Sequence, residues 1–251
     1  MKQKKIIALL LIAAMATALF SGCSSKDDTV VIGYIGDLSG ADAYVGIPPQ
    51  LFLQDYFAKV NENGGLLGKK VKLVAYDMQP DNAVDGVNAC NRLISQDHAI
   101  AILGPSSSSA AIPMANICDE AKVPFIATSA TNEKVTVAED GKLHPYAFRV
   151  CFIDPVQGRI AASFIADYLG YDKAAILYDV NDDYAQGLKD NFIAVYTEKG
   201  GTVVAEEGYT AGDTDFTAQL TKIKEAQPQI IFTPIFYQDF IMIHKQARTL
   251  G

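Results

Sequence analysis

Two short apolar segments of this chain each end in a cluster of hydroxyl-bearing residues. Residues 99–103 run into Ser106-Ser-Ser-Ser109, and residues 125–127 run into Thr128-Ser-Ala-Thr131. Both segments are typical of buried strands, and open α/β sheets bind ligands just beyond the carboxyl ends of their strands. The serines also begin a predicted helix over about residues 107–121, whose first N–H groups and partial positive charge suit an anion. Together the two segments predict a site for a small carboxylate.

Each cluster also has a purely structural interpretation. Ser107 or Ser108 could cap the predicted helix, because serine is among the preferred N-cap residues, and Thr131 could lie in a turn. Either segment alone favours this structural interpretation. We interpret the two segments together as a binding site, since two such strand ends side by side bring their polar groups to one edge of a sheet.

Residues that could do catalytic chemistry do not form a recognisable constellation. The three histidines, His98, His144 and His244, are far apart, and neither a GxSxG nucleophile elbow nor an HExxH zinc motif occurs. Asp81 and Asp85 lie one turn apart on a predicted helix, where a cap and a solvated face account for them better than an acid–base pair. We therefore predict that the protein is not an enzyme.

Cysteine usage argues against a metal site. Cys90, Cys118 and Cys151 are widely spaced and form no CxxC or cysteine–histidine ligand pattern, so we expect neither a metal nor a cofactor. Cys90 and Cys118 lie on consecutive predicted helices and could pair in an oxidising compartment. Buried free thiols are the interpretation that we prefer for them.

The first residues are typical of an exported lipoprotein. Three lysines precede an apolar stretch over residues 6–19 that is short for a membrane span. The following Leu19-Phe-Ser-Gly-Cys23 resembles a bacterial lipobox, which implies a signal peptide over residues 1–22, lipidation of Cys23 and a flexible tether over residues 23–29. Ordinary secretion with cleavage nearby is the alternative. The predicted location is extracytoplasmic, with a lipid anchor at the cell membrane.

The charge balance excludes one class of partner. Without residues 1–22 the chain has 18 basic and 29 acidic residues, a formal charge of −11. Nucleic acid is therefore not an expected partner, because binding phosphates requires a basic patch. Beyond the leader, no second apolar stretch approaches membrane-spanning length.

The rest of the chain alternates β-branched apolar runs with amphipathic segments, a pattern that predicts βαβ units and parallel sheets. Strands are predicted at about residues 30–35, 71–76, 99–103, 125–127, 146–151, 174–178, 202–205 and 230–233. Helices are predicted at about residues 48–61, 81–95, 107–121, 183–199 and 238–250, with further helices starting at Asp154 and at Asp213 or Thr214, and with Asp81 and Asp154 as caps. The predicted fold class is α/β, with two lobes over residues 30–145 and 146–251. The second lobe ends after a helix where another strand is expected, so we expect it to be incomplete.

Eight short motifs occur in one register along residues 30–251. They are Gly36-Asp-Leu-Ser-Gly40, Gly104-Pro with Ser108, Ala130-Thr131, Phe148-Arg149, Asp154 with Gln157-Gly158, Tyr184 with Gly187-Leu188, Asp215-Phe216 and Lys245-Gln-Ala-Arg248. In this order the chain resembles the bacterial extracytoplasmic solute-binding proteins of the leucine/isoleucine/valine-binding family. The resemblance implies the type I periplasmic-binding-protein fold, with two Rossmann-like lobes joined by a hinge.

The resemblance also implies a ligand site between the lobes, and it assigns first-lobe residues to that site. Ser108, next to Ser107 at the predicted helix start, falls where the family binds the carboxylate of its ligand. Ser129 and Thr131, with Ala130 between them, fall where a backbone carbonyl and a threonine hydroxyl hold the ammonium and carboxylate groups. Such groups can hold a zwitterion without fixed counter-charges.

Aromatic residues complete the site that the resemblance implies. Tyr184 falls where an aromatic ring of the second lobe closes over the ligand. Phe236 falls near a position often occupied by tyrosine, with Tyr237 beside it, and Tyr44 lies close to an aromatic position of the first lobe. The acid that pairs with the ammonium group in the amino-acid binders would lie beyond Gly251.

The function implied by the resemblance is the capture of a small ligand, a branched-chain or other amino acid, and its delivery to the permease of an ABC transporter by a monomer. Two alternatives stay open. The same fold serves as the ligand-sensing domain of receptors, and related proteins bind solutes such as amides or aromatic acids. The N-terminal lipid anchor favours a freestanding binding protein over a receptor domain.

Overall fold

The first lobe is organised around β1 (Thr29–Gly36), the first apolar run after the predicted tether. The computed structural model describes residues 29–40, 42–79 and 82–251, so the predicted signal peptide and Cys23 lie outside the described residues. β1 pairs in parallel with β2 (Lys70–Asp77) on one side and with β3 (Ala101–Leu103) on the other. The sheet continues through β4 (Phe125–Ala127) to β5 (Ala147–Arg149), in the order β2-β1-β3-β4-β5.

Strand β5 corrects the predicted lobe boundary. The predicted boundary places residues from 146 onward in the second lobe, but β5 pairs in parallel with β4 and is the edge strand of the first sheet. A strand of three residues has too few positions to show which sheet it joins, so its pairing is decided by tertiary contacts. The chain crosses to the second lobe only after Arg149.

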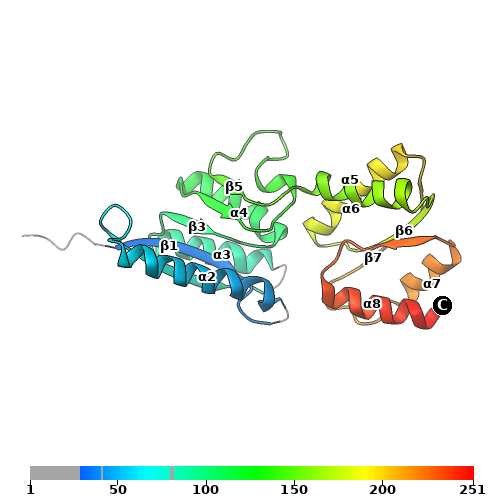
Figure 1. Cartoon of the computed structure of the whole chain (residues 1–251), viewed down its shortest axis with the longest axis horizontal. Coiled ribbons are helices and arrows are strands. Elements are labelled where there is room, and N and C mark those ends of the chain that lie inside the picture. The colour runs from blue at the N-terminus through cyan, green and yellow to red at the C-terminus, as the bar shows by residue number, and fades with distance from the viewer. Residues whose placement is uncertain (1–28, 41, 80–81) are drawn as a thin grey trace, which may run out of the picture.

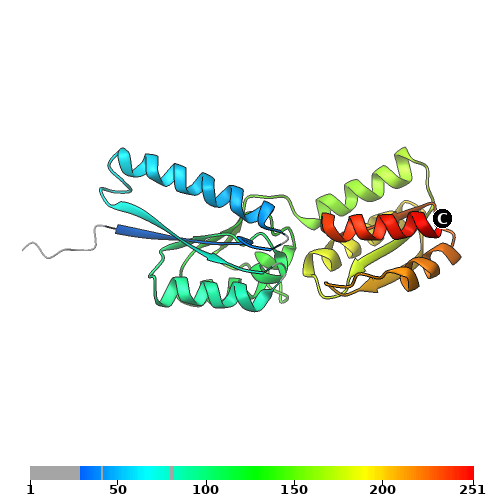
Figure 2. The same cartoon turned by 90° about the horizontal axis from the view of Figure 1, so that it is seen from below.

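Helices cover both faces of the first sheet. They are α2 (Ala43–Glu62), α3 (Ala83–Ser95) and α4 (Ser108–Ala121). Figure 2 shows α2 on one face and α3 on the opposite face. The apolar stripes of α3 and α4 pack on the sheet, where Leu93, Ile102, Met114 and Phe125 are fully buried. A 3-10 turn, η1 (Glu133–Val135), is the only helical element described between β4 and β5.

The second lobe repeats the layered arrangement with a smaller sheet. Parallel strands β6 (Lys173–Asp179), β7 (Thr202–Tyr209) and β8 (Ile230–Phe232) lie in the order β7-β6-β8. One face is covered by α5 (Asp154–Ser163), its π-helical continuation η2 (Phe164–Tyr168), and α6 (Asp183–Glu198). The other face is covered by α7 (Thr217–Glu225) and α8 (Tyr237–Leu250). Figure 1 shows the two lobes side by side, with the chain passing between them from β5 to α5. The predicted α/β class with parallel sheets in two lobes is confirmed.

Two helices of the first lobe begin at positions that differ from the predicted ones. α2 begins at Ala43, five residues before the expected start at Pro48, and contains both prolines. The N–H of Val45 bonds to the carbonyl of Asp42 at 2.8 Å and forms the first turn ahead of the prolines. At α3 the cap is Asn82, whose side chain accepts the first N–H groups of the helix. The predicted cap, Asp81, lies outside the described residues.

Two helices of the second lobe also differ at their starts. Asp154 is not a cap but the first residue of α5, with Ile153 before it and a buried side chain. α7 begins at Thr217, so neither Asp213 nor Thr214 caps it; the carboxylate of Asp213 instead accepts the N–H of Thr210 at 3.0 Å. Aspartate and threonine stabilise turns by the same kind of bond that they use in caps, which is why the sequence could not separate the two roles.

In the described part of the chain, none of the helices is long and apolar enough to cross a membrane.

Candidate ligand-binding site

A cavity of ≈ 310 Å³ lies where the two lobes meet. On the first lobe it is bounded by the residues that follow β1, β3 and β4, and on the second lobe by the starts of α5, α6 and α8. The lining residues are Asp37, Asp42, Val45, Ser106, Ser107, Ser108, Ser129, Thr131, Cys151, Phe152, Gln157, Tyr184, Ile235 and Phe236. Because the strands of the first sheet are parallel, their carboxyl ends converge on this edge, and the two hydroxyl clusters meet there.

Six of the eight predicted ligand-binding residues line this cavity, and two do not. Those in the lining are Ser107, Ser108, Ser129, Thr131, Tyr184 and Phe236. Ala130 is buried outside the lining. Its carbonyl accepts a hydrogen bond from Nη1 of Arg149 at 3.0 Å, which links it to β5. Tyr44 is half-exposed, and its ring packs edge-to-face on Tyr237 of the second lobe with the ring centroids 4.8 Å apart. These two residues therefore do not line the cavity; they contact Arg149 of β5 and Tyr237 of α8 instead.

The serines at the start of α4 have different partners. Ser107 is the N-cap of α4, and its Oγ accepts the N–H of Ala110 at 3.4 Å. The structural interpretation of Ser107 is therefore correct, although the residue also lines the cavity. The Oγ of Ser108 accepts the N–H of Asn132 at 3.2 Å. That bond joins the helix start to the segment after β4 and brings the two predicted clusters together.

Thr131 and Asp154 are buried polar residues on opposite sides of the lobe crossing. The N–H of Asp154 donates to the carbonyl of Thr131 at 3.1 Å. The Thr131 hydroxyl and the Asp154 carboxylate are neighbours, and among the described residues neither makes a hydrogen bond of ordinary geometry to a third group. Burial raises the pKa of Asp154 to about 6, while the nearby Thr131 hydroxyl and the Arg149 guanidinium act in the opposite direction.

Aromatic and aliphatic side chains form the second-lobe wall. The rings of Tyr184 and Phe236 are tilted, with their centroids 5.9 Å apart. Gln157 at the start of α5 donates from Nε2 to the Tyr184 hydroxyl at 3.1 Å, which fixes that ring. Phe152 and Ile235 extend the apolar surface. Phe236 stands near a position that the family often fills with tyrosine, and its neighbour Tyr237 does not line the cavity but packs its ring on Tyr44.

Sequence reasoning missed the acidic side of the cavity. Asp37 follows β1 directly and Asp42 precedes α2, and both are buried in the lining. The rule that ligands bind beyond the carboxyl ends of strands applies to β1 as it does to β3 and β4, so Asp37 could have been found by the same argument. Asp42 could not, since only the tertiary fold brings the start of α2 to the cavity.

A buried polar junction joins the lobes next to the cavity. The Ser109 hydroxyl donates to Asp182 Oδ1 at 3.0 Å and accepts the N–H of Asp183 at 3.0 Å. Asp182 also caps α6, accepting the N–H groups of Tyr184 and Ala185. The junction therefore fixes the start of α6, and with it Tyr184, against the start of α4.

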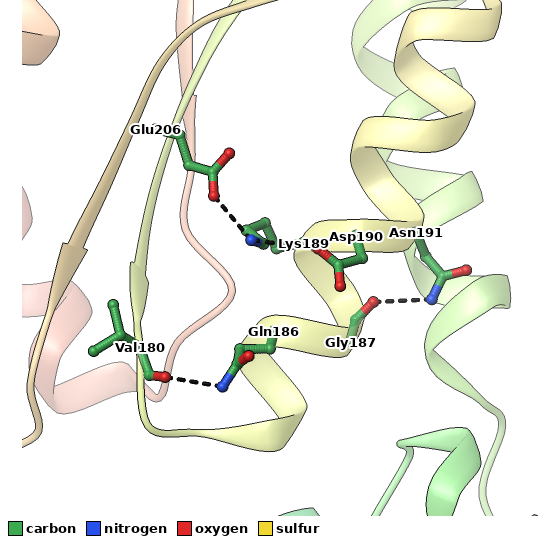
Figure 3. A network of polar contacts seen from close by, with 7 residues as sticks. All are labelled: Val180, Gln186, Gly187, Lys189, Asp190, Asn191 and Glu206. Atoms are coloured by element: carbon green, nitrogen blue, oxygen red, sulfur yellow. Dashed lines mark hydrogen bonds and ion pairs between the residues drawn. The ribbon is translucent and has the colours of Figure 1, made fainter. Parts of the chain in front are cut away.

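Figure 3 shows how the rest of α6 is held to its own lobe. The Nε2 of Gln186 donates to the carbonyl of Val180 at 2.8 Å, and the Nζ of Lys189 lies 2.8 Å from Glu206 on β7. These contacts tie the helix to the end of β6 and to the middle of β7. Tyr184, one of the two rings of the aromatic wall, is thus on a helix that is anchored at both lobes.

The cavity can hold a small ligand with hydrogen bonds at one end and apolar contacts at the other. Hydroxyls and the start of α4 suit a carboxylate, and the aromatic wall suits an aliphatic or aromatic group. In the residues that the structure describes, no group of three or more histidine, cysteine or acidic side chains is placed to hold a metal ion. Cys90 and Cys118 are buried free thiols with sulfurs 3.7 Å apart, away from the cavity.

Comparison with known sequences gives the same family as the motifs. A family model described as periplasmic binding protein matches residues 29–251. The chain is 35% identical over 243 residues to an "Amino acid binding protein" of Pseudomonas aeruginosa, and 28% identical over 241 residues to a "Leucine-, isoleucine-, valine-, threonine-, and alanine-binding protein" of the same organism. Each alignment covers 96% of this chain and 63% of the relative, so the chain spans less than two thirds of the length of these relatives.

Solved structures agree with this placement. A branched-chain amino acid transporter substrate-binding protein from Streptococcus pneumoniae, in complex with isoleucine, matches with a TM-score of 0.76 and 32% identity over 89% of this chain and 62% of its own. A solute-binding protein of R. palustris in complex with 4-hydroxybenzoate matches with a TM-score of 0.69 and 27% identity over 82% of this chain and 54% of its own. These proteins are named for binding, in agreement with the prediction of a protein that is not an enzyme. The chain therefore belongs to the type I periplasmic binding proteins of the leucine/isoleucine/valine-binding family.

Proposed function

We propose that this protein captures a small α-amino acid, branched-chain or other, between its two lobes and delivers it to the membrane permease of an ABC transporter. Ser108, Ser129 and Thr131 would hold the zwitterionic end of the ligand, and Tyr184 and Phe236 would cover its side chain. The observation that carries the proposal is the meeting of two hydroxyl clusters, at the start of α4 and after β4, in one cavity whose opposite wall is apolar. The amino-acid binders among the relatives support it.

The setting of this function is part of the same proposal. The lipobox-like Leu19-Phe-Ser-Gly-Cys23 supports a monomeric lipoprotein held outside the cytoplasmic membrane by lipidated Cys23. Metabolic labelling with a clickable fatty acid tests the anchor, because Cys23→Ser would abolish the label. A label that persists in Cys23→Ser would contradict lipidation at this residue.

Calorimetric titration of the full-length mature protein with leucine, isoleucine and valine tests the amino-acid ligand, together with a thermal-shift screen of all the amino acids. A ligand at one hundred times its dissociation constant should stabilise the fold by about 2.7 kcal/mol. We expect the double variant Ser108→Ala, Thr131→Ala to bind at least roughly a hundredfold more weakly, since two hydrogen bonds to charged groups are lost. Ser95→Ala, exposed on α3, is the control and should bind as the natural protein does.

Aromatic acids are the second candidate ligands, because a structural relative was solved with 4-hydroxybenzoate and the cavity has an aromatic wall. The titration panel therefore includes 4-hydroxybenzoate. Binding of this acid without binding of any amino acid would replace the proposed ligand class. A receptor domain of the same fold would bind the same ligands but would not stimulate uptake through a permease in a reconstituted transport assay.

A further inference from the structure

Two buried carboxyl groups form the acidic side of the interlobe cavity. Asp37 is 3% exposed and Asp42 is 7% exposed, and both line the cavity. Oδ2 of Asp37 accepts the Ser106 hydroxyl at 2.6 Å. The carboxyl group of Asp42 is hydrogen-bonded by the Gln238 side chain, but its buried Oδ1 has no hydrogen-bond partner among the described residues. Asp42 precedes α2, yet its side chain makes no capping bond, so the usual use of aspartate at a helix start does not explain this carboxyl group.

The lining provides no positive charge to balance these acids. Among the described residues that line the cavity, none is a lysine, arginine or histidine. Buried carboxylates are stable only when they are paired with a cation or hydrogen-bonded. An ordinary zwitterionic amino acid brings one ammonium and one carboxylate group, so it adds no net positive charge. A ligand with a second cationic group would bring the missing charge.

We propose that Asp37 and Asp42 form a subsite for a cationic group on the ligand side chain, so that the cavity selects small amino acids that carry a second ammonium or guanidinium group. This inference rests on the proposed function and narrows its ligand class. The carboxylate of such a ligand would lie at the serines and Thr131, and its distal cation would lie between the end of β1 and the start of α2. The acidic side would also repel a monoanionic aromatic acid.

The surroundings of the two acids support this subsite. Burial raises the pKa of Asp37 and of Asp42, and repulsion from Asp42 contributes to the shift at Asp37. The titratable groups that face them from neighbouring elements are Tyr34, Tyr44, Asp77 and Asp239, and none of these can supply a positive charge. A cation bound beside the two acids would lower both pKa values and release protons.

Ornithine and norleucine test the subsite, since their side chains have the same number of heavy atoms and differ in a terminal ammonium or methyl group. We expect calorimetry on the full-length mature protein to give at least roughly tenfold tighter binding of ornithine. Asp37→Asn and Asp42→Asn should each weaken ornithine binding by about tenfold and change norleucine binding by less than about twofold. Asp55→Asn, exposed on α2, is the matched control and should change neither affinity. Norleucine binding also shows that each variant is folded.

Proton release gives a second readout. Titrations of ornithine in buffers with different ionisation enthalpies should show protons leaving the protein, whereas norleucine should release fewer, because it brings no charge to Asp37 and Asp42. Equal affinities for the two ligands, or equal weakening of both by Asp42→Asn, would overturn the subsite and leave the amino-acid function standing. Failure of every amino acid to bind would overturn the proposed function instead.

Discussion

Asp154 is a carboxyl group that the fold buries, with the Thr131 hydroxyl as a neighbouring hydrogen-bonding group. Its position follows from the lobe crossing, because its N–H is bound to the carbonyl of Thr131 and the side chain then points between the lobes, close to Gly187 of α6. The Arg149 guanidinium on β5 lowers the pKa of Asp154, and the Asp182 carboxylate at the start of α6 raises it. Its charge is therefore sensitive to both lobes, although it does not line the cavity.

The raised pKa of Asp154 predicts how its replacement changes stability with pH. The pKa is about 6 in the folded protein and has the lower ordinary value of 3.8 in the unfolded chain. The stability that this residue contributes is therefore fully present below about pH 4 and is lost as the pH rises through about 6. We expect Asp154→Asn to be more stable than the natural protein at pH 7.5, by up to about 2 kcal/mol, and the difference should shrink toward pH 4.5.

Urea unfolding at the two pH values measures this difference. Asp55→Asn is the control, since its side chain is well exposed and should change stability by less than about 0.5 kcal/mol at either pH. If Asp154→Asn were less stable than the natural protein at pH 7.5, the ionised carboxylate would be a stabilising group and the prediction would be wrong.

At the scale of secondary-structure elements, the cavity depends on how closely α6 approaches the first lobe. Gly187 lies on the side of α6 that faces the crossing, and a Cβ there would lie 2.6 Å from both Asn132 Nδ2 and Asp154 Oδ2. Asn132 Nδ2 donates to the carbonyl of Asp183 at 2.7 Å, so it cannot move without loss of that bond. The glycine is needed here for space, because its backbone is helical and would accept any residue.

Gly187→Ala is accordingly expected to destabilise the protein by about 1–3 kcal/mol, the usual cost of overpacking a buried contact. Alanine has the higher helix propensity, so a change governed by the helix alone would stabilise by about 1 kcal/mol. Thermal unfolding separates the two outcomes by their sign. Asp190→Ala, exposed on the same helix, serves as the control.

At the scale of the whole molecule, the described lobes are joined by a backbone crossing and by the buried junction of Ser109, Asp182 and Asp183. The hydrogen bond from Asn132 to the carbonyl of Asp183 adds a further link. The junction brings the starts of α4 and α6 together and places a carboxylate between their partial positive charges. The arrangement holds the two walls of the cavity at a fixed separation. Capture of a ligand by lobe movement would require this junction to act as the pivot or to open.

Ser109→Ala tests the role of the junction. The variant removes one hydrogen bond to a charged group and one to a backbone N–H, so we expect a loss of about 1–3 kcal/mol in the free energy of unfolding. Hydrogen exchange should become faster at the starts of both α4 and α6, which lie in different lobes. Faster exchange at α4 alone would mean that Ser109 stabilises only its own helix and does not couple the lobes.

The sequence by itself determined the alternation of strands and helices, and with it the α/β class and the two lobes. Hydrophobic periodicity is a local property, and the runs that form β1, β2 and β6 are long enough to express it. The hydroxyl clusters at residues 106–109 and 128–131 also pointed to the cavity, because the ends of parallel strands must share an edge. The family resemblance added Tyr184 and Phe236, which line the cavity.

Only the tertiary structure decided which sheet β5 joins, where α2 begins, and which predicted site residues lie outside the cavity lining. Ala130 and Tyr44 have the residue types and positions of ligand contacts, but contacts with Arg149 and Tyr237 hold them outside the lining. Asp42 enters the lining because α2 packs along the sheet (Figure 2) with its N-terminal end at the cavity. These outcomes depend on packing between segments far apart in the chain, and no local pattern of residues carries that information.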